Sequence, residues 1–350
     1  MDIKIFKNMA RVAGGNAYLS KNYKLQPSHD PLILTNRFPT VNESAICNSF
    51  DNLFQKNPCL SLIVYSKGNI IYENYRKPAS DSCPLFSWSM SKSLIAFTLG
   101  YLLSNGIIKN LDDSGSTYSK DLDGTVFGES SLRNMLTMSS GVKLSKENGN
   151  QSLTEWHDMT NGSYSTVDHL KIYGKKEMVP GQSFNYSGTD TEAICNIIDN
   201  NGGFLNYFKK YIWEPSQCES IGYWMLEKKD RVVAQAGFSA VARDWIRIAL
   251  HTIKELNSSD TVLRNYLKEA TSPQIENNNL HGNTTLRHYG YQTWIGDFNK
   301  QLSYWFCGMS GIRLGIDPVN DKIVYVCSYD STGDYVKQIY RTFNDFQNLI

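Results

Sequence analysis

The hydrophobic and polar positions of this chain follow a strand-like pattern near both ends. The apolar runs at residues 60–65 and 70–75 flank the turn sequence Ser-Lys-Gly-Asn, which predicts a β-hairpin. After about residue 288, short runs rich in aromatic and β-branched residues predict further strands at 289–296, 302–308, 312–317 and 322–329. Strands are therefore expected from segments that lie far apart in the sequence.

Between these regions the pattern favours helices. From about residue 88 to 104 nearly every position is apolar, which predicts a core helix without a polar face. Further helices are predicted at about 41–55, 131–138, 166–173, 189–200, 204–212, 239–256 and 334–350. The 239–256 segment places four apolar residues near one helical face: Val241, Trp245, Ile248 and Ile253.

This order of elements predicts an α+β fold, with one antiparallel sheet built from both chain ends and a mainly helical region inserted between its strands. We expect residues 1–40 to form an N-terminal arm, irregular over 21–40 where three prolines occur. Residues 41–87 with 285–350 form the expected sheet domain, and 88–284 the helical domain. An active site is expected in the cleft between the two domains.

Charge and hydropathy exclude several classes of partner. The chain has 350 residues, with 35 basic and 34 acidic side chains, and this balance favours neither nucleic acid nor an anionic membrane surface as a partner. No stretch reaches the roughly 18 apolar residues of a membrane-spanning helix. The first 20 residues lack the apolar core of a secretory signal, so we expect a cytoplasmic protein, or a periplasmic one if the true start lies upstream. The oligomeric state is not indicated.

Cysteine and histidine spacing argues against a disulfide scaffold, a metal site or a cofactor. The seven cysteines are scattered and never form C-x-x-C, and the six histidines show no ligand spacing. The sequence also lacks H-E-x-x-H, the phosphate-binding G-x-x-x-x-G-K-[ST] loop and the G-x-S-x-G elbow of α/β-hydrolases.

Ser89 and Lys92 are candidate catalytic residues at the start of the apolar helix. Residues three positions apart share a helical face, so the two side chains can meet. A serine in the first turn also lies near free backbone N–H groups, which favour developing negative charge. Burial would lower the pKa of the lysine, in extreme cases by about 3–5 units, so that it could accept the serine proton. The alternative is a helix-capping serine beside a solvated lysine.

A second S-x-x-K sequence shows that the spacing alone is a weak signal. Ser140 and Lys143 have the same separation, but Gly141 follows Ser140 in a loop-like stretch. Ser89 instead opens a long apolar helix, and this context favours it.

Three segments together resemble the class C β-lactamase-related serine hydrolases, including their esterase and 6-aminohexanoate-dimer hydrolase branches. The segments are FSWSMSKSLIAFTLGYLLSNGII with the following LRNMLTMSSGV (132–142), PGQSFNYSGTDTEAI (180–194) and SYWFCGMSGIRLGIDP (303–318). They occur in the order of the family, and the resemblance covers about residues 59–330. It implies that Ser140 is a structural turn serine.

The second segment resembles the family's Tyr-x-Asn element, and the resemblance implies that Tyr186 lies beside Ser89 and Lys92. A tyrosinate, or a tyrosine that shares its proton with the lysine, can act as general base and then as acid. The alternative is a half-buried aromatic residue on a loop. Gly188 occupies the position of the family's Asn, which argues against efficient turnover of β-lactams.

The third segment resembles the family's strand that edges the active site. The corresponding residues here are Gly308, Met309, Ser310 and Gly311, without the family's lysine or histidine. The resemblance implies that the backbone N–H groups of Ser89 and Met309 form an oxyanion hole. Glycine permits a close approach of backbone to substrate, and Gly308 and Ser310 are candidate pocket residues. The missing cation weakens the case for a substrate carboxylate.

Other residues are assigned by their place in the resemblance. Trp156 and His157 lie where relatives have a pocket-lining loop; Trp156 is a candidate apolar wall, and His157 is either a substrate contact or a solvated loop residue. Trp88 is expected to pack in the core. Arg243 and Asp244 are expected to form a packing pair.

The resemblance implies a serine hydrolase that cleaves a small amide or ester through an acyl-enzyme on Ser89, with Lys92 and Tyr186 as the base. The changes at Gly188 and Met309 support an alternative. In it, a penicillin-binding-like module binds a ligand, or is acylated, without efficient turnover. The sequence does not indicate the natural substrate or the physiological role.

Overall fold

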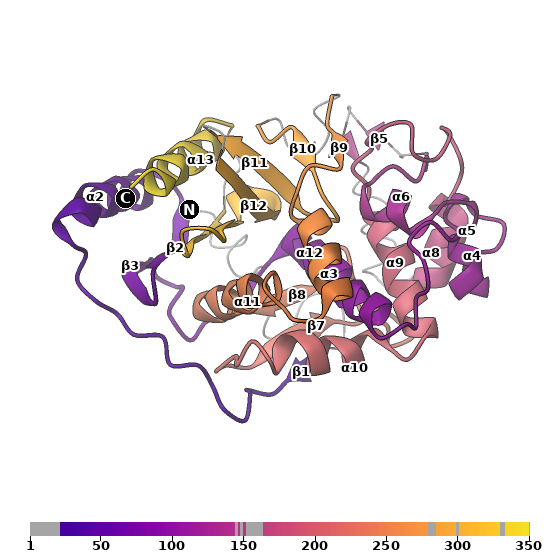
Figure 1. Cartoon of the computed structure of the whole chain (residues 1–350), viewed down its shortest axis with the longest axis horizontal. Helices are drawn as coiled ribbons and strands as arrows, with labels where there is room; N and C mark the ends of the chain where they lie inside the picture. Colours follow the sequence, from indigo (N-terminus) through magenta and orange to yellow (C-terminus); the bar gives the residue numbers. More distant parts are fainter. Residues whose placement is uncertain are drawn as a thin grey trace.

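One antiparallel eight-stranded sheet joins the two ends of the chain (Figure 1). The computed structural model describes residues 22–143, 146–147, 150–151, 164–278, 285–298, 301–329 and 333–349. The strand order in this sheet is β3 (Asn69–Tyr75), β2 (Cys59–Ser66), β14 (Lys322–Ser328), β13 (Arg313–Asp317), β12 (Gln301–Cys307), β11 (Trp294–Phe298), β10 (His288–Tyr289) and β9 (Ile275–Glu276). The predicted α+β fold with a sheet from both ends of the chain is confirmed.

The pairing of β2 with β14 connects the early and late parts of the sequence, with Val64 opposite Val324. The hairpin of β2 and β3 turns through Lys67 and Gly68, which both have positive φ. A two-residue turn of this hand matches the twist of the flanking strands, and it confirms the hairpin predicted from the sequence.

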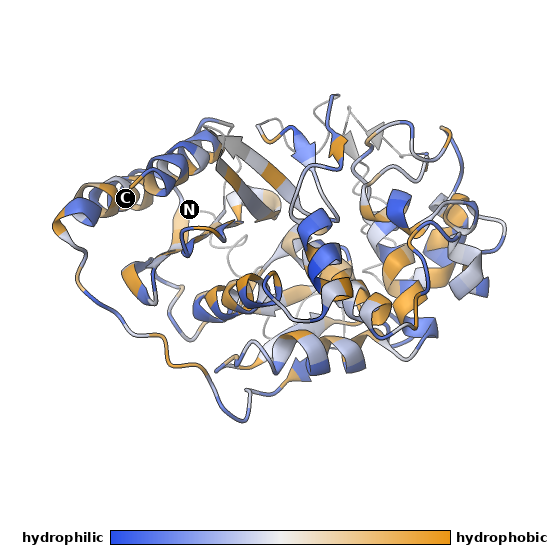
Figure 2. Cartoon of the chain, viewed as in Figure 1, coloured by the Kyte–Doolittle hydropathy of each residue, from blue (hydrophilic) through white to orange (hydrophobic). Residues whose placement is uncertain are grey.

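Helices cover both faces of this sheet. Leu62 and Val64 of β2 pack in one cluster with α2 (Val41–Lys56) and α13 (Gly333–Gln347), which lie side by side in Figure 1. Ile63 and Tyr65 point to the opposite face, as the period of two in a strand requires, and share a second cluster with α11 (Ala242–Glu255). In Figure 2, α11 and α13 carry both hydrophobic and hydrophilic residues, as expected of helices packed on one side.

The helical region surrounds α3 (Ser91–Ser104), whose residues from Ser91 to Leu102 are all buried. Its neighbours are α9 (Gly188–Asn200), α10 (Phe204–Phe208) and α12 (Thr261–Ala270). Within the described residues, the other helical elements are η1 (Trp88–Met90), α4 (Gly115–Tyr118), η2 (Lys120–Leu122), α5 (Val126–Glu129), α6 (Leu132–Leu136), α8 (Thr166–Tyr173), the π-helical turn η3 (Lys209–Trp213) and η4 (Met309–Gly311). The strands β5 (Lys146–Glu147) and β6 (Asn150–Gln151) pair with each other.

A second sheet of four strands was not predicted from the sequence. Its order is β1 (Asn22–Leu25), β7 (Gly222–Met225), β8 (Phe238–Ala240) and β4 (Leu85–Phe86). The prediction of a helix from residue 239 is therefore wrong at its start, because 239–240 pair with β4 and the helix begins only at Ala242. The expected irregular arm likewise contains a strand at Asn22–Leu25, which pairs with β7.

We propose the division into a sheet domain and a helical domain with two changes to the segments that form the sheet domain. β9 belongs to the large sheet although it precedes residue 285, and α11 packs on β2 and β14. We propose that these two elements be counted with the sheet domain.

Candidate active site

Ser89 lies in a short turn between β4 and α3. The turn is held in place by Ser87, whose N–H and Oγ both donate hydrogen bonds to the carbonyl of Phe238, at 2.9 and 2.8 Å. Trp88 has φ +50, an uncommon conformation for a residue other than glycine, which turns the chain into η1. The predicted helix from residue 88 is thus a 3-10 turn followed by an α-helix that starts at Ser91.

Lys92 directs its amine at the Ser89 hydroxyl. Its Nζ lies 3.0 Å from Oγ of Ser89 and donates a second hydrogen bond to the carbonyl oxygen of Gln235 at 2.6 Å. The lysine is only 3% exposed, so the alternative of a solvated lysine is wrong. Burial lowers the pKa of Lys92 to about 7, against an opposing effect of the Glu192 carboxyl. A substantial fraction of the amine is therefore neutral near pH 7.

Tyr186 converges on the same two side chains from the loop before α9. The Lys92 Nζ lies 5.5 Å from the centre of the Tyr186 ring. Burial raises the pKa of Tyr186 to about 12, and a hydrogen bond with the Ser89 side chain lowers it in part. The phenol therefore keeps its proton at neutral pH, which favours a tyrosine that donates and relays a proton over a resting tyrosinate.

A buried carboxyl group, Glu192, lies close to this cluster. Glu192 is on α9 and accepts hydrogen bonds from the backbone N–H groups of Gln235 at 2.9 Å and Ala234 at 3.3 Å. Burial raises its pKa to about 8, although these backbone bonds and the charge of Lys92 lower it. Glu192 was not predicted from the sequence, where its signal is an acidic residue among the apolar positions of a predicted helix.

The segment around Gly308 and Met309 lies against the Ser89 turn. A Cβ added at Gly308 would overlap the carbonyl oxygen of Ser87 and lie 3.4 Å from its carbonyl carbon, so only glycine fits there. Ser310 has φ +58, and its carbonyl accepts a hydrogen bond from Oγ of Ser328 at 2.6 Å. The Met309 side chain is 51% exposed. These contacts bring the predicted third segment next to the first.

The buried side chain of Arg313 orients the peptide between Gly308 and Met309. Its guanidinium donates to the carbonyl oxygens of Gly308 at 2.5 Å and Ile312 at 2.7 Å, and to the hydroxyl of Tyr340 at 2.8 Å. In a trans peptide the C=O and N–H point in opposite directions, so the N–H of Met309 faces away from Arg313. Arg313 lies two residues beyond the 308–311 segment in which a cation was expected, and no sequence signal distinguished it.

Gly188 is the first residue of α9, two positions after Tyr186. The side chain of Gln235 covers it, because a Cβ added at Gly188 would overlap Oε1 of Gln235 and lie 2.6 Å from its Cδ. No sequence pattern pointed to Gln235.

The structure also locates the other residues named from the sequence. Trp156 and His157 lie outside the described residues. Ser140 is buried, in a turn that continues through Gly141 with φ +82, and Lys143 is exposed. Trp88 is half-buried and packs edge-on against Phe86, with ring centres 4.9 Å apart.

The predicted packing pair of Arg243 and Asp244 is wrong. Arg243 forms an ion pair with Glu73 at 2.6 Å, whereas Asp244 pairs with Arg247 at 2.9 Å. Neighbouring positions on a helix point in different directions, so each side chain finds a partner on its own side.

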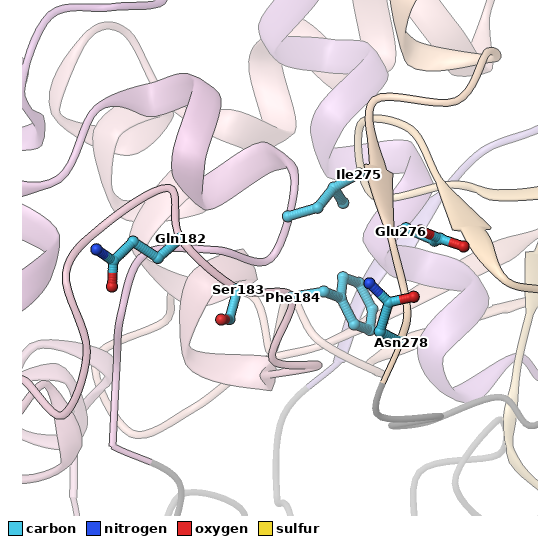
Figure 3. A pocket seen from close by; sticks show the side chains of 6 residues that line it. All are labelled: Gln182, Ser183, Phe184, Ile275, Glu276 and Asn278. Atoms are coloured by element: carbon cyan, nitrogen blue, oxygen red, sulfur yellow. The ribbon is translucent and has the colours of Figure 1, made fainter.

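A small pocket lies beside the Tyr186 loop (Figure 3). It has a volume of about 150 Å³ and is lined by Gln182, Ser183, Phe184, Ile275, Glu276 and Asn278. Phe184 belongs to the aromatic cluster around Tyr186, with ring centres 6.4 Å apart. Through Phe184 the pocket is a neighbour of the candidate site, formed where the Tyr186 loop meets β9.

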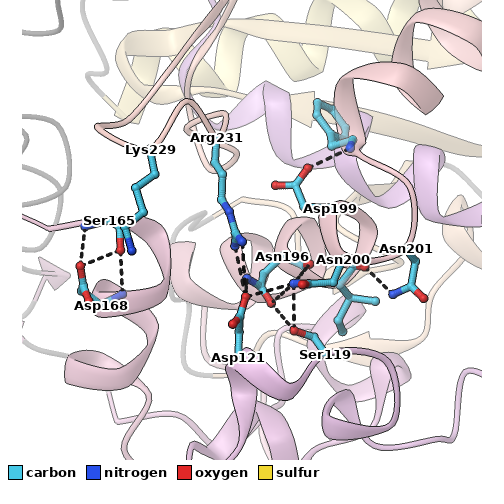
Figure 4. Close-up of polar contacts among 12 residues, drawn as sticks. Ser119, Asp121, Ser165, Asp168, Asn196, Asp199, Asn200, Asn201, Lys229 and Arg231 are labelled. Carbon is cyan, nitrogen blue, oxygen red and sulfur yellow. Dashed lines mark hydrogen bonds and ion pairs between the residues drawn. The ribbon is translucent and has the colours of Figure 1, made fainter.

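A polar cluster further along α9 has a structural role (Figure 4). Asp121 accepts hydrogen bonds from Asn196 at 3.0 Å and Asn200 at 3.1 Å, and it pairs with Arg231 at 3.4 Å. These contacts tie α9 and the chain before Gln235 to η2. They therefore stabilise the two segments that carry Glu192 and Gln235.

Within the part of the chain that the structure describes, no group of three or more His, Cys, Asp or Glu side chains is placed to hold a metal ion. None of the helices described is both long and apolar enough to cross a membrane.

Comparison with known proteins gives a consistent result. The sequence model of the family described as Beta-lactamase matches residues 50–342, whereas no curated protein matches the chain. A Bacillus anthracis protein, provisionally named a 6-aminohexanoate-dimer hydrolase, has a similar structure, with a TM-score of 0.80 and 18% identity over 94% of this chain and 90% of that one. A penicillin-binding protein from Bacillus halodurans has a TM-score of 0.65 and 14% identity, over 85% of this chain and 98% of that one. A Bacteroides dorei protein, provisionally named a beta-lactamase, has a TM-score of 0.67 and 14% identity, over 88% of this chain and 100% of that one. At such low sequence identities, the structural similarity to these three proteins shows that the chain shares their fold and nothing more.

Proposed function

Because this chain belongs to the beta-lactamase family, we propose that it is a serine hydrolase that cleaves an amide or ester through an acyl-enzyme on Ser89. The observation that carries the proposal is the pair of Ser89 and Lys92. A lysine that is buried, has a pKa near 7 and lies 3.0 Å from a serine hydroxyl can take up the serine proton.

In the acylation step, neutral Lys92 accepts the proton of Ser89 as Oγ bonds to the substrate carbonyl carbon. Tyr186 gives its proton to the leaving nitrogen or oxygen as that bond breaks, and it regains a proton from Lys92. Water then attacks the acyl-enzyme, gives its proton to the same relay, and the bond to Ser89 breaks as Oγ is protonated. The hydrogen bond of the Tyr186 and Ser89 side chains supports this assignment of roles.

The backbone N–H groups of Ser89 and Met309 are the proposed oxyanion hole. The contact of Gly308 with Ser87 supports it, because this contact brings Met309 to the Ser89 turn. Arg313 supports it as well, since its bond to the Gly308 carbonyl fixes the orientation of the Met309 N–H. Donors held in place before the reaction stabilise the charge of the transition state most effectively.

The proposed substrate is a small molecule with an amide or ester bond. One similar protein is provisionally named for the hydrolysis of a 6-aminohexanoate dimer, so amides of ω-amino acids belong in the substrate panel. Gly188 in place of the family's Asn, and the absence of a cation at 308–311, favour weak hydrolysis of β-lactams.

A second candidate follows from the same two departures. In it, the chain is a penicillin-binding-like module that is acylated at Ser89 without efficient turnover. The two candidates differ only in deacylation, the step in which water releases the acyl group from Ser89. A burst of product followed by no steady turnover would therefore favour the penicillin-binding-like module.

A fluorescent fluorophosphonate probe and a substrate panel test the proposal. The probe should label Ser89, as located by mass spectrometry. Turnover of p-nitrophenyl esters or ω-amino-acid amides should fall by several orders of magnitude in Ser89→Ala and Lys92→Ala. Matched controls are Ser82→Ala and Lys143→Ala, which change an exposed serine and an exposed lysine. Undiminished turnover in Ser89→Ala would reject the assignment.

A further inference from the structure

Trp294, at the start of β11, packs against the phenol ring of Tyr186. The two ring centres lie 5.4 Å apart with their planes tilted by 37°, and Trp294 is only 3% exposed. Phe184 and Tyr289 complete the cluster, with ring centres 5.6 and 4.8 Å from that of Trp294. Tyr186 also contacts both of these rings, at 6.4 and 6.3 Å. Three aromatic neighbours therefore limit the movement of the Tyr186 side chain.

The start of β11 is anchored in the helical region by Gln292. This buried residue of the β10–β11 turn has φ +51, and its backbone N–H and Nε2 donate to the carbonyls of Leu136 at 2.8 Å and Met135 at 2.9 Å. Its carbonyl accepts a hydrogen bond from Oγ of Ser93 at 2.6 Å, and its Oε1 accepts one from Oγ1 of Thr191 at 2.7 Å. These bonds fix the first residue of β11 relative to α3 and α9, the two helices that follow Ser89 and Tyr186 in the chain.

A hydrogen bond joins the side chains of Trp294 and Tyr186. Burial raises the pKa of the Tyr186 phenol to about 12, and hydrogen bonds with the Ser89 and Trp294 side chains lower it in part. An indole nitrogen is a donor only, so the phenol oxygen accepts the bond from Trp294. The phenol proton cannot point at a donor, so it is left to the other side of the oxygen, where Ser89 is the partner.

From this arrangement we infer that Trp294 is a positioning residue that directs the O–H of Tyr186 toward the reacting bond. The inference rests on the proposed function, in which Tyr186 gives its proton to the leaving group. A leaving group that is a strong base needs this proton, whereas a weakly basic one leaves without it. The loss of Trp294 should therefore matter most for substrates with strongly basic leaving groups.

The first test uses three esters of one acid: p-nitrophenyl, phenyl and ethyl hexanoate, in order of increasing basicity of the leaving group. All three form the same acyl-enzyme, so kcat/KM compares the acylation step alone. In Trp294→Phe, kcat/KM should fall about tenfold more for the ethyl ester than for the p-nitrophenyl ester, as expected when one hydrogen bond to a group that gains charge is lost. An equal loss for all three esters would overturn the inference, because damage to packing alone does not distinguish leaving groups.

Trp305→Phe is the matched control on the neighbouring strand. Trp305 lies directly opposite Trp294, is fully buried, and its indole N–H donates to Oγ of Ser303 at 3.0 Å. Its ring packs against Tyr340 and Phe343. The same substitution there should lower the melting temperature and leave the ratio of the three ester rates unchanged. A change of this ratio as large as in Trp294→Phe would contradict a specific role of Trp294.

A double-mutant cycle tests whether Trp294 acts through Tyr186. Tyr186→Phe should lower kcat/KM for the ethyl ester by about 100-fold relative to the p-nitrophenyl ester, because the proton donor is gone. In that background Trp294→Phe should add no further dependence on the leaving group. Effects of the two substitutions that multiply in the double variant would overturn the inference.

A titration separates failure of this inference from failure of the proposed function. Difluorotyrosine placed at position 186 ionises at lower pH than tyrosine, and its fluorine NMR signal reports on this one phenol. Without the indole donor, the titration midpoint should move to higher pH by about one unit in Trp294→Phe, and it should stay in place in Trp305→Phe. An unchanged midpoint in Trp294→Phe would overturn the inference. This readout needs no turnover, so it decides the role of Trp294 even if the fluorophosphonate probe leaves Ser89 unlabelled and the hydrolase proposal fails.

Discussion

Lys92 and Glu192 are two buried ionisable groups on different helices that are joined through a single residue. Lys92 donates to the carbonyl of Gln235 at 2.6 Å, and Glu192 accepts from the N–H of the same residue at 2.9 Å. Each group shifts the pKa of the other toward its charged form, whereas burial shifts both toward the neutral form. Burial is the larger effect for both, and it leaves Lys92 with a pKa of about 7.

The first prediction concerns the pH dependence of kcat/KM. Activity should rise as pH increases through about 7, because Lys92 must lose its proton to act as a base. In Glu192→Gln the acid limb should stay within about half a unit of wild type, because burial raises the pKa of Glu192 to about 8 and this carboxyl is largely neutral where Lys92 titrates. Glu129→Gln changes an exposed glutamate and serves as control. A wild-type kcat/KM that does not change with pH around 7 would argue against Lys92 as the base, and a shift of more than one unit in Glu192→Gln would show that Glu192 is charged where Lys92 titrates.

The second prediction concerns Arg313. Arg313→Gln should lower kcat for the ester by about tenfold or more, with a smaller effect on KM, because the Met309 N–H loses its fixed orientation. Arg313→Lys should lose less, since it keeps the charge but not the planar donor geometry. The exposed Arg287→Gln is the matched control. Melting temperatures must be measured in parallel, because unpairing the two carbonyls costs about 1–3 kcal/mol each. A folded Arg313→Gln protein with full activity would refute the role.

The third prediction uses Gly308. Gly308→Ala should reduce activity by about 100-fold, the size of effect seen when an oxyanion donor is displaced, because the new Cβ pushes the 308–309 segment away from Ser87. Gly124→Ala is the control: its φ is +76 and its surroundings are open, so it should cost about 1 kcal/mol of stability without loss of activity. Steady-state kinetics together with thermal unfolding measure both. If the two variants lose the same fraction of activity, the contact with Ser87 does not position the site.

The fourth prediction concerns stability rather than activity. Burial raises the pKa of Asp190 to about 7, so the folded state binds a proton there that the unfolded state releases near pH 4. This contribution to stability is present below pH 4 and is lost as pH rises through 7. An asparagine at this position does not titrate, so Asp190→Asn does not lose this contribution as pH rises. The difference in free energy of unfolding between the variant and the wild type should therefore change in favour of the variant by roughly 1–3 kcal/mol from pH 5 to pH 8.

Urea unfolding at these two pH values provides the measurement. The control is Asp168→Asn, since hydrogen bonds with Ser165 lower the pKa of this half-buried helix-capping carboxyl. Because its pKa is lowered in the folded state, ionised Asp168 stabilises the protein at every pH above the unfolded pKa of the carboxyl. Asp168→Asn should therefore lower the free energy of unfolding at both pH 5 and pH 8. An Asp190→Asn effect that is the same at pH 5 and pH 8 would show that Asp190 does not hold the proton.

The sequence by itself determined the local features of this protein. The positions of Ser89 and Lys92 one helical turn apart followed from spacing, and the burial of the lysine followed from the apolar residues around it. The β2–β3 hairpin and the α13 helix were likewise predictable. In these cases the interacting residues are close in the chain, so periodicity and turn residues carry the information.

Only the tertiary structure decided which distant residues complete the site. Gln235 meets Lys92 across 143 positions of sequence, and its side chain covers Gly188. Arg313 is positioned by its hydrogen bond to the carbonyl of Gly308, and the strand β8 is positioned by its pairing with β4. Such contacts depend on the packing of whole elements, which competes with local preference and can override it, as at residues 239–240.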